Sequence, residues 1–247
     1  MMASRDSVIQ AIEERKSVRS FTDSTPSPDI LCRCGAESSP YLRIIDPGTL
    51  GNGRIGSYGV ISGRPAYVAV VCKDDELVQA GIDGERMVLA LTGHGLGTCW
   101  LGGTFNRPRV LAAMPPLPDG VKCVAVIAVG YPKQHRGLVE RVMRKAVRAD
   151  HRMCVSDFII AGAAPAYLAA ALEAVRMAPS ACNRQPWRFA FNPSGSIDVY
   201  GTPSDSFMTL DVGIALAHFL AVAPQYKLVG NDHPHPTLTP VATLIPA

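Results

Sequence analysis

The sequence predicts a globular protein that combines helices with buried strands and is organised in two halves. Three observations support this prediction. The 247 residues are 47% hydrophobic and 18% charged, which is enough apolar material for the core of one large domain or two small ones. Helix-like segments alternate with apolar, strand-like runs along the chain. A basic stretch at 140–152 then separates an N-terminal half, residues 1–150, from a C-terminal half, residues 151–247.

Three helices and two buried strands are predicted in the first half. The helices cover 6–16, 84–94 and 108–114, where apolar residues recur at helical spacing. The strands cover 65–73 and 121–132, because these runs are apolar rather than alternating, as in a strand buried on both faces.

Two loop regions complete the first half. A tight glycine loop is expected at 95–105, directly after the second predicted helix. The stretch 22–63 is rich in Pro, Ser and Gly and predicts loops with short helices.

The second half predicts a helix that ends before Pro179, a strand at 187–191 and its hairpin partner at 196–201. Proline ends the helix because it lacks the N–H group that a continuing turn would use. The segment 210–223 predicts a buried helix, since it is nearly uncharged. Its opening residues weakly resemble those of the helix at 84–94.

A small polar corner joins the helix that ends before Pro179 to the strand that follows. It contains Ser180, Ala181, Asn183 and Gln185. Backbone N–H groups in such a corner are free to meet a ligand.

Charge and cysteine content exclude several classes of protein. A net charge of +3 with scattered cations is too little for a nucleic-acid interface. Seven dispersed cysteines without a CxxC pair predict reduced thiols and a cytoplasmic location. No signal peptide is expected, and the uncharged stretch 158–172 is interrupted by Pro165 and too short to cross a bilayer. We expect no metal, since no histidine has zinc-ligand spacing.

Six stretches resemble signature blocks of the nitroreductase family, the FMN-dependent oxidoreductases. They read AIEERKSVRSF, PAYVAVV, DGERMVLALTGHGLGTCWLGG, AVGYP, APSACNRQPWRF and DVGIALAHF. The Pro-Ser-x-x-Asn-x-Gln-Pro-Trp corner follows the Gly-Tyr-Pro strand here, whereas the family usually places it after the Arg-x-Ser-x-Arg helix. The chain therefore resembles the subfamily in which two nitroreductase-like halves are fused. This resemblance implies an α+β fold with a central, mostly antiparallel sheet flanked by helices, built as an intramolecular pseudo-dimer.

The resemblance also implies a site for the FMN phosphate. Arg15 and Arg19 would offer forked donors to the phosphate dianion, and Ser17 would add a hydroxyl. Three residues of the basic stretch would close the same pocket: Arg141, Arg144 and Lys145.

The resemblance also implies that both halves line the flavin ring. Gly102 and Gly103 would bring backbone N–H groups close to flavin N5. The corner of the second half would supply the opposite wall through Pro179, Ser180, Ala181 and Asn183.

For five nearby side chains we favour a structural role over a role at the flavin. Gln185 and Trp187 would pin the corner to the strand, and Trp100 would belong to the core rather than stack on flavin. His94 and His218 would lie satisfied on buried helices.

The implied activity is ping-pong electron transfer. NADH or NADPH would reduce FMN and leave, and an oxidised small-molecule acceptor would then take the electrons at the same face. No catalytic side chain is expected, because the flavin carries the chemistry. Two alternatives remain: a non-enzymatic flavin- or nucleotide-binding protein, and a flavin-consuming or dehalogenating relative.

One FMN per chain is expected, because each half contains only part of the motif set. A monomeric pseudo-dimer would then suffice, and a further dimer stays open. The sequence identifies neither the acceptor nor the preferred nicotinamide coenzyme.

Overall fold

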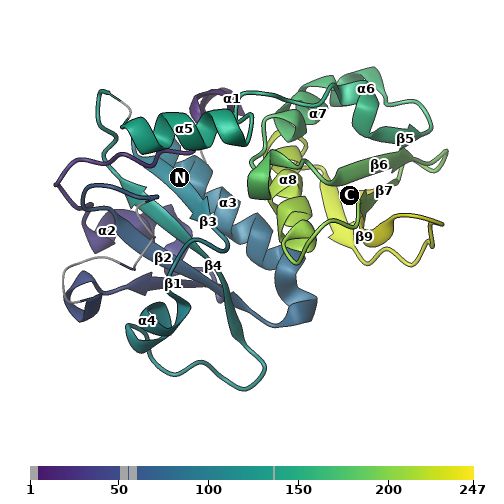
Figure 1. Cartoon of the computed structure of the whole chain (residues 1–247). Coiled ribbons are helices and arrows are strands. Elements are labelled where there is room, and N and C mark those ends of the chain that lie inside the picture. The colour runs from purple at the N-terminus through teal and green to yellow at the C-terminus, as the bar shows by residue number, and fades with distance from the viewer. Residues whose placement is uncertain (1–4, 51–54, 56–59, 136) are drawn as a thin grey trace.

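The computed structural model describes residues 5–50, 55, 60–135 and 137–247. Figure 1 shows two groups of elements side by side, each with its own sheet and one long helix. The helices are α1 (Arg5–Glu14), α2 (Pro28–Leu31), α3 (Leu77–Gly93), α4 (Arg107–Ala112), α5 (Leu138–Ala146), α6 (Val155–Phe158), α7 (Ala169–Arg176) and α8 (Met208–Val222). The strands are β1 (Leu42–Ile45), β2 (Ala66–Cys72), β3 (Gly97–Leu101), β4 (Lys122–Gly130), β5 (Ile159–Ala161), β6 (Trp187–Phe191), β7 (Ile197–Gly201), β8 (Tyr226–Val229) and β9 (Thr239–Pro246).

The first sheet has the order β1-β2-β4-β3 and is antiparallel throughout. Every residue of β2 is buried, as its apolar run predicts, and β4 also lies where it was expected. The glycine-loop prediction at 95–105 was wrong over Gly97–Leu101, which forms strand β3. The flanking glycines concealed this strand, whose Leu101 pairs with Val126 of β4.

The second sheet has the order β5-β6-β7-β9-β8, and only the pair β5 and β6 is parallel. The predicted hairpin of β6 and β7 is confirmed. Residues of the C-terminal tail form β9, which lies between β7 and β8. These two last strands had no counterpart in the sequence analysis.

The helices α3 and α8 pack together between the two sheets (Figure 1). Gly81 of α3 makes this approach possible, because a Cβ atom there would lie 2.5 Å from the carbonyl oxygen of Leu210. Gly213 of α8 faces the backbone of Val78 at similarly close range. Helix α3 begins earlier than the predicted 84–94 and ends just before Gly95, whose φ of 76° suits glycine.

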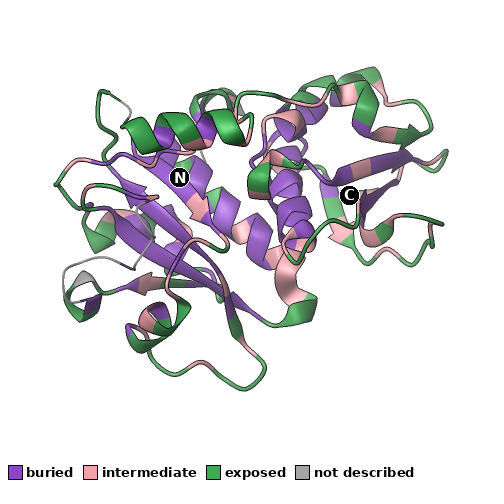
Figure 2. Cartoon of the chain, viewed as in Figure 1, coloured by how far each residue is buried: buried purple, intermediate pink, exposed green. Residues whose placement is uncertain are grey.

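The predicted α+β fold with mostly antiparallel strands and flanking helices is confirmed, although the strands form two sheets. The pseudo-dimer and the division at residue 150 stay predictions. Ile12 of α1 packs in the same apolar cluster as Phe158 and Val212, so the first helix contributes to the core of the second half. Figure 2 shows strands that are largely buried, whereas α5 is mostly exposed.

Candidate functional site

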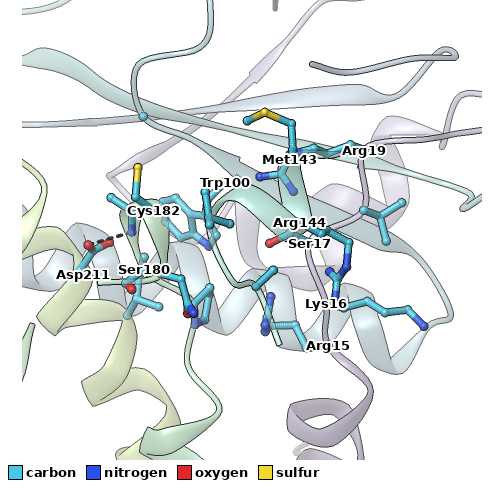
Figure 3. A pocket seen from close by; sticks show the side chains of 18 of the residues that line it. Arg15, Lys16, Ser17, Arg19, Trp100, Met143, Arg144, Ser180, Cys182 and Asp211 are labelled. Carbon is cyan, nitrogen blue, oxygen red and sulfur yellow. Dashed lines mark hydrogen bonds between the residues drawn. The ribbon is translucent and has the colours of Figure 1, made fainter. Parts of the chain in front are cut away.

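A cavity of about 810 Å³ lies where the segment after α1, the end of β3 and α5 meet the corner before β6 and the start of α8. Figure 3 shows Ser180, Cys182 and Asp211 on one side, the arginine-rich group on the other and Trp100 between them. The volume is typical of small-molecule sites, about 300–1,000 Å³. Ten of the twelve predicted site residues line this cavity: Arg15, Ser17, Arg19, Gly102, Gly103, Arg144, Pro179, Ser180, Ala181 and Asn183.

The arginine-rich side is positioned by the chain that leaves α1. The backbone N–H of Val18 donates to the carbonyl of Thr98 in β3 at 2.8 Å. Gly97 allows this contact, because a Cβ atom there would come within 2.8 Å of the Val18 side chain. The pairing fixes Ser17 and Arg19 beside the sheet edge, with Arg15 one turn earlier.

Several buried guanidinium atoms in this region have no hydrogen-bond partner among the described residues. They are Nε of Arg15, both Nε and Nη1 of Arg19, and Nε of Arg152. Arg15 is only 6% exposed, and its Nε lies 3.9 Å from the Glu85 carboxylate. A buried donor without a partner costs about 1–3 kcal/mol, more when it is charged. These atoms therefore fit an anionic ligand such as a phosphate.

Burial and neighbouring positive charges lower the pKa of two arginines in this region. Burial lowers the pKa of Arg15, and the nearby Glu85 carboxylate partly offsets this effect. Burial, and next the charge of Arg15, lower the pKa of Arg152 to about 10. Arg144 forms an ion pair with Asp150. A phosphate dianion would relieve the mutual repulsion of these groups.

A buried polar network lies behind the arginines. The Glu85 carboxylate is fully buried and accepts hydrogen bonds from Nε1 of Trp100 at 2.7 Å. It also faces Nε2 of His218 at 2.9 Å, while Nδ1 of His218 lies 2.9 Å from the Ala174 carbonyl. Because a carbonyl only accepts, Nδ1 is the donor in its contact with Ala174. The network connects α3, β3, α7 and α8.

These contacts test the structural roles that were predicted for three side chains. His218 is a satisfied core residue as predicted. The same prediction for His94 was wrong, because this residue is exposed just after the end of α3. Trp100 is only partly buried and both lines the cavity and donates to Glu85.

The corner before β6 has a strained backbone. Cys182, Asn183 and Gln185 have left-handed φ values of 51°, 57° and 51°, and each such conformation costs a non-glycine residue about 1 kcal/mol or more. The Ser180 hydroxyl accepts from the Gln185 N–H at 2.9 Å, and the surrounding structure thereby holds the corner in shape. Strain of this kind clusters at ligand sites.

Two corner side chains hold the linker between the halves. The Asn183 amide donates to the carbonyls of Arg148 at 2.8 Å and His151 at 2.9 Å, and its oxygen accepts from Arg152 at 2.9 Å. Asn183 thus anchors the 148–152 segment, although it also lines the cavity. Gln185 accepts from the Met153 N–H at 2.8 Å, so its side chain holds the corner to the linker and not, as was predicted, to the strand. Trp187 is fully buried, as expected.

The two predicted glycines differ in their surroundings. A Cβ atom on Gly102 would lie 2.7 Å from the Phe207 ring, so this glycine allows the second half to approach β3. Nothing lies within 4 Å of a Cβ atom on Gly103. Only Gly103 therefore has the open space that a ligand approaching its backbone would need.

Asp211 is a cavity residue that the sequence analysis did not single out. Its side chain is 4% exposed, and its Oδ2 accepts the Ala181 N–H at 2.9 Å. Burial raises the pKa of this carboxyl to about 8, although the Ala181 hydrogen bond opposes the rise. The only sequence signal was its place at the start of an uncharged helix.

The remaining two predicted residues, Arg141 and Lys145, do not line the cavity. They line a separate hollow of about 420 Å³ at the C-terminal end of α5, together with Arg148 and His151. Arg144, Ala149 and Asp150 line both spaces.

Known proteins match this chain over nearly its whole length. A family model described as "Putative TM nitroreductase" matches residues 7–223, and the chain belongs to this nitroreductase family. The crystal structure of a "putative nitroreductase" from Thermotoga maritima is 23% identical and covers 99% of this chain and 96% of its own, with a TM-score of 0.63. This similarity shows the fold.

Two further structures match about half of the chain. A "putative nitroreductase in complex with FMN" from Desulfovibrio desulfuricans is 24% identical, with 54% of this chain and 94% of that chain covered and a TM-score of 0.40. An "FMN-dependent nitroreductase" from Clostridium difficile is 15% identical, with 52% and 89% covered and a TM-score of 0.41.

Three further features of the described residues bear on function. They contain no group of three or more His, Cys, Asp or Glu side chains arranged to hold a metal. All seven cysteines are free. No described helix has the length and apolar character that a membrane span requires.

Proposed function

We propose that the protein is an FMN-dependent NAD(P)H oxidoreductase of the nitroreductase type that reduces a small-molecule acceptor. The observation that carries this proposal is the cavity with unpaired, buried guanidinium atoms of Arg15 and Arg19 at one side. Family membership supports it, and the fold supplies a site built from both halves.

Different residues of the chain would bind the phosphate of FMN and position the side chains around it. Arg15, Arg19 and Arg144 would hold the phosphate, with the Ser17 hydroxyl beside them. The Glu85 network would orient Arg15 and Trp100 from behind. Bound FMN would supply the capacity to accept a hydride from NAD(P)H and to pass the electrons on.

The opposite side of the cavity would shape the position of the ring. The strained corner from Pro179 to Asn183 presents backbone that is fixed in advance by Asp211, Ser180 and Gln185. Gly103 leaves open space at the end of β3.

The first experiment is spectroscopic. Protein loaded with FMN and freed of excess should retain about one flavin per chain, because each half contributes a different part of one site. Anaerobic NADH or NADPH should then bleach the flavin band. Retained flavin that neither coenzyme bleaches would instead indicate a flavin-binding protein without this activity.

Steady-state kinetics tests the order of the two half-reactions. If coenzyme and acceptor use the same face in turn, initial rates against NAD(P)H at several acceptor concentrations give parallel lines in double-reciprocal form. Intersecting lines would reject the ping-pong scheme.

A further inference from the structure

The hollow at the C-terminal end of α5 has a strong excess of positive charge. We call it the basic hollow; its cationic residues are Arg141, Arg144, Lys145 and Arg148. Among the described residues that line it, the only carboxylate is that of Asp150, which is already paired with Arg144. Among the described residues, no ion pair involves the other three cations. The basic hollow therefore has about three positive charges without a counter-charge.

The basic hollow adjoins the main cavity. Arg144, which is 9% exposed, lies in the wall between the two spaces and lines both. Asp150 also lines both. The two spaces therefore lie next to each other, on either side of Arg144.

The corner of the second half holds the far side of this hollow in place. Arg148 has a left-handed φ of 47°, and its carbonyl accepts from the Asn183 amide at 2.8 Å. The same amide holds the carbonyl of His151, another residue of the hollow. The contacts that anchor the linker therefore also fix the backbone of the basic hollow.

The phosphate of FMN does not account for the basic hollow. That phosphate would be held in the main cavity, where the unpaired atoms of Arg15 and Arg19 are buried. Arg141 and Lys145 are exposed and lie outside the main cavity. A second anionic group explains these cations better.

We propose that the basic hollow binds the 2′-phosphate of NADPH and that the protein prefers NADPH to NADH. This inference rests on the proposed function. A coenzyme with its nicotinamide in the cavity must place its adenosine half outside, and the basic hollow is the adjoining space. NADPH and NADH differ only in the 2′-phosphate, which forms charge-assisted contacts with Arg and Lys.

The first test measures binding without any flavin chemistry. Calorimetry compares 2′,5′-ADP with 5′-AMP, which lacks the 2′-phosphate. Wild-type protein should bind 2′,5′-ADP about tenfold more tightly, the effect of one charge-assisted contact at the low end of its range. The variant Arg141→Ala/Lys145→Ala should lose this difference. Equal binding of both ligands to wild type would overturn the proposal.

A matched control removes the same charge elsewhere. Arg43 on β1 and Lys227 on β8 are both exposed and absent from either space. The variant Arg43→Ala/Lys227→Ala should therefore keep the tenfold preference. If it loses the preference as the first variant does, the effect comes from net charge and the proposal is wrong.

The second test uses the FMN-loaded protein and compares kcat/KM for the two coenzymes. The Arg141→Ala/Lys145→Ala variant should lower the value for NADPH about tenfold and leave that for NADH nearly unchanged, with equal FMN content. An equal loss for both would place the pyrophosphate in the hollow and reject the 2′-phosphate assignment. Selective 2′,5′-ADP binding without oxidation of either coenzyme would support the site and contradict the proposed function.

Discussion

The buried carboxyl of Asp211 should make the stability of the protein depend on pH in a specific direction. Its pKa in the folded protein is raised from 3.8 to about 8, mainly by burial. Near neutral pH the folded protein therefore holds a proton that the unfolded chain releases. The free energy of unfolding should fall as pH rises from about 4 to about 8, and it should level off above that pH.

The size of this effect follows from the two pKa values. Each unit of pKa corresponds to about 1.4 kcal/mol. The interval between 3.8 and about 8 then corresponds to about 6 kcal/mol over the full pH range and about 4 kcal/mol at pH 7. A value of several kcal/mol is large compared with a total stability of about 5–15 kcal/mol.

The variant Asp211→Asn tests this reasoning. Asparagine keeps an oxygen that can accept the Ala181 N–H but cannot ionise. Urea unfolding of both proteins at several pH values should show the variant gaining stability over wild type as pH rises, by several kcal/mol at pH 8. Asp119→Asn, at an exposed carboxylate, should run parallel to wild type. Parallel profiles for Asp211→Asn and wild type would refute the assignment.

Two further predictions concern the phosphate site and the contact between the halves. Arg15→Ala should weaken FMN binding by roughly 1.5–3 kcal/mol, measured by flavin retention, with Arg43→Ala as the control; unchanged retention would remove Arg15 from the site. Gly81→Ala should destabilise the protein by about 1–2 kcal/mol in urea, because overpacking against the Leu210 carbonyl at 2.5 Å outweighs the gain in helix propensity. Gly93→Ala, with nothing within 4 Å of the new Cβ, should cost nothing, and equal losses for the two glycines would contradict the close helix crossing.

The sequence predicted the helices and strands whose residue pattern can be recognised within the segment alone. The apolar runs of β2 and β4 and the uncharged helix α8 need no distant partner to be recognised. Strands β5 and β8 were not predicted, and the prediction of loops with short helices over 22–63 was wrong at Leu42–Ile45, which form β1. Strands β3 and β9 were also missed, because glycines flank the first, and prolines and polar residues precede or interrupt the second. Each becomes a strand by pairing with neighbours, β3 with β4 and β9 with β7 and β8.

The residues of the candidate site could also be predicted only in part from the sequence. Arg15, Ser17 and Arg19 were predicted from the resemblance of their stretch to a family signature, and they line the cavity. Asp211 and Glu85 carry no local signal, because their importance depends on burial and on partners far along the chain. No sequence pattern separates Arg144, which lines the main cavity, from Lys145, its neighbour on the other side of the same wall.

The two sides of the candidate site come from different halves of the chain. The unpaired arginine atoms belong to the segment after α1, whereas the strained corner belongs to the second half. The Glu85 carboxylate links the two sides, since it lies near Arg15 and faces His218 of α8. Neither half alone would retain both the anion-binding side and the partner that orients it. The close approach of α3 and α8 at Gly81 and Gly213 is therefore a condition for the cavity as well as for the fold.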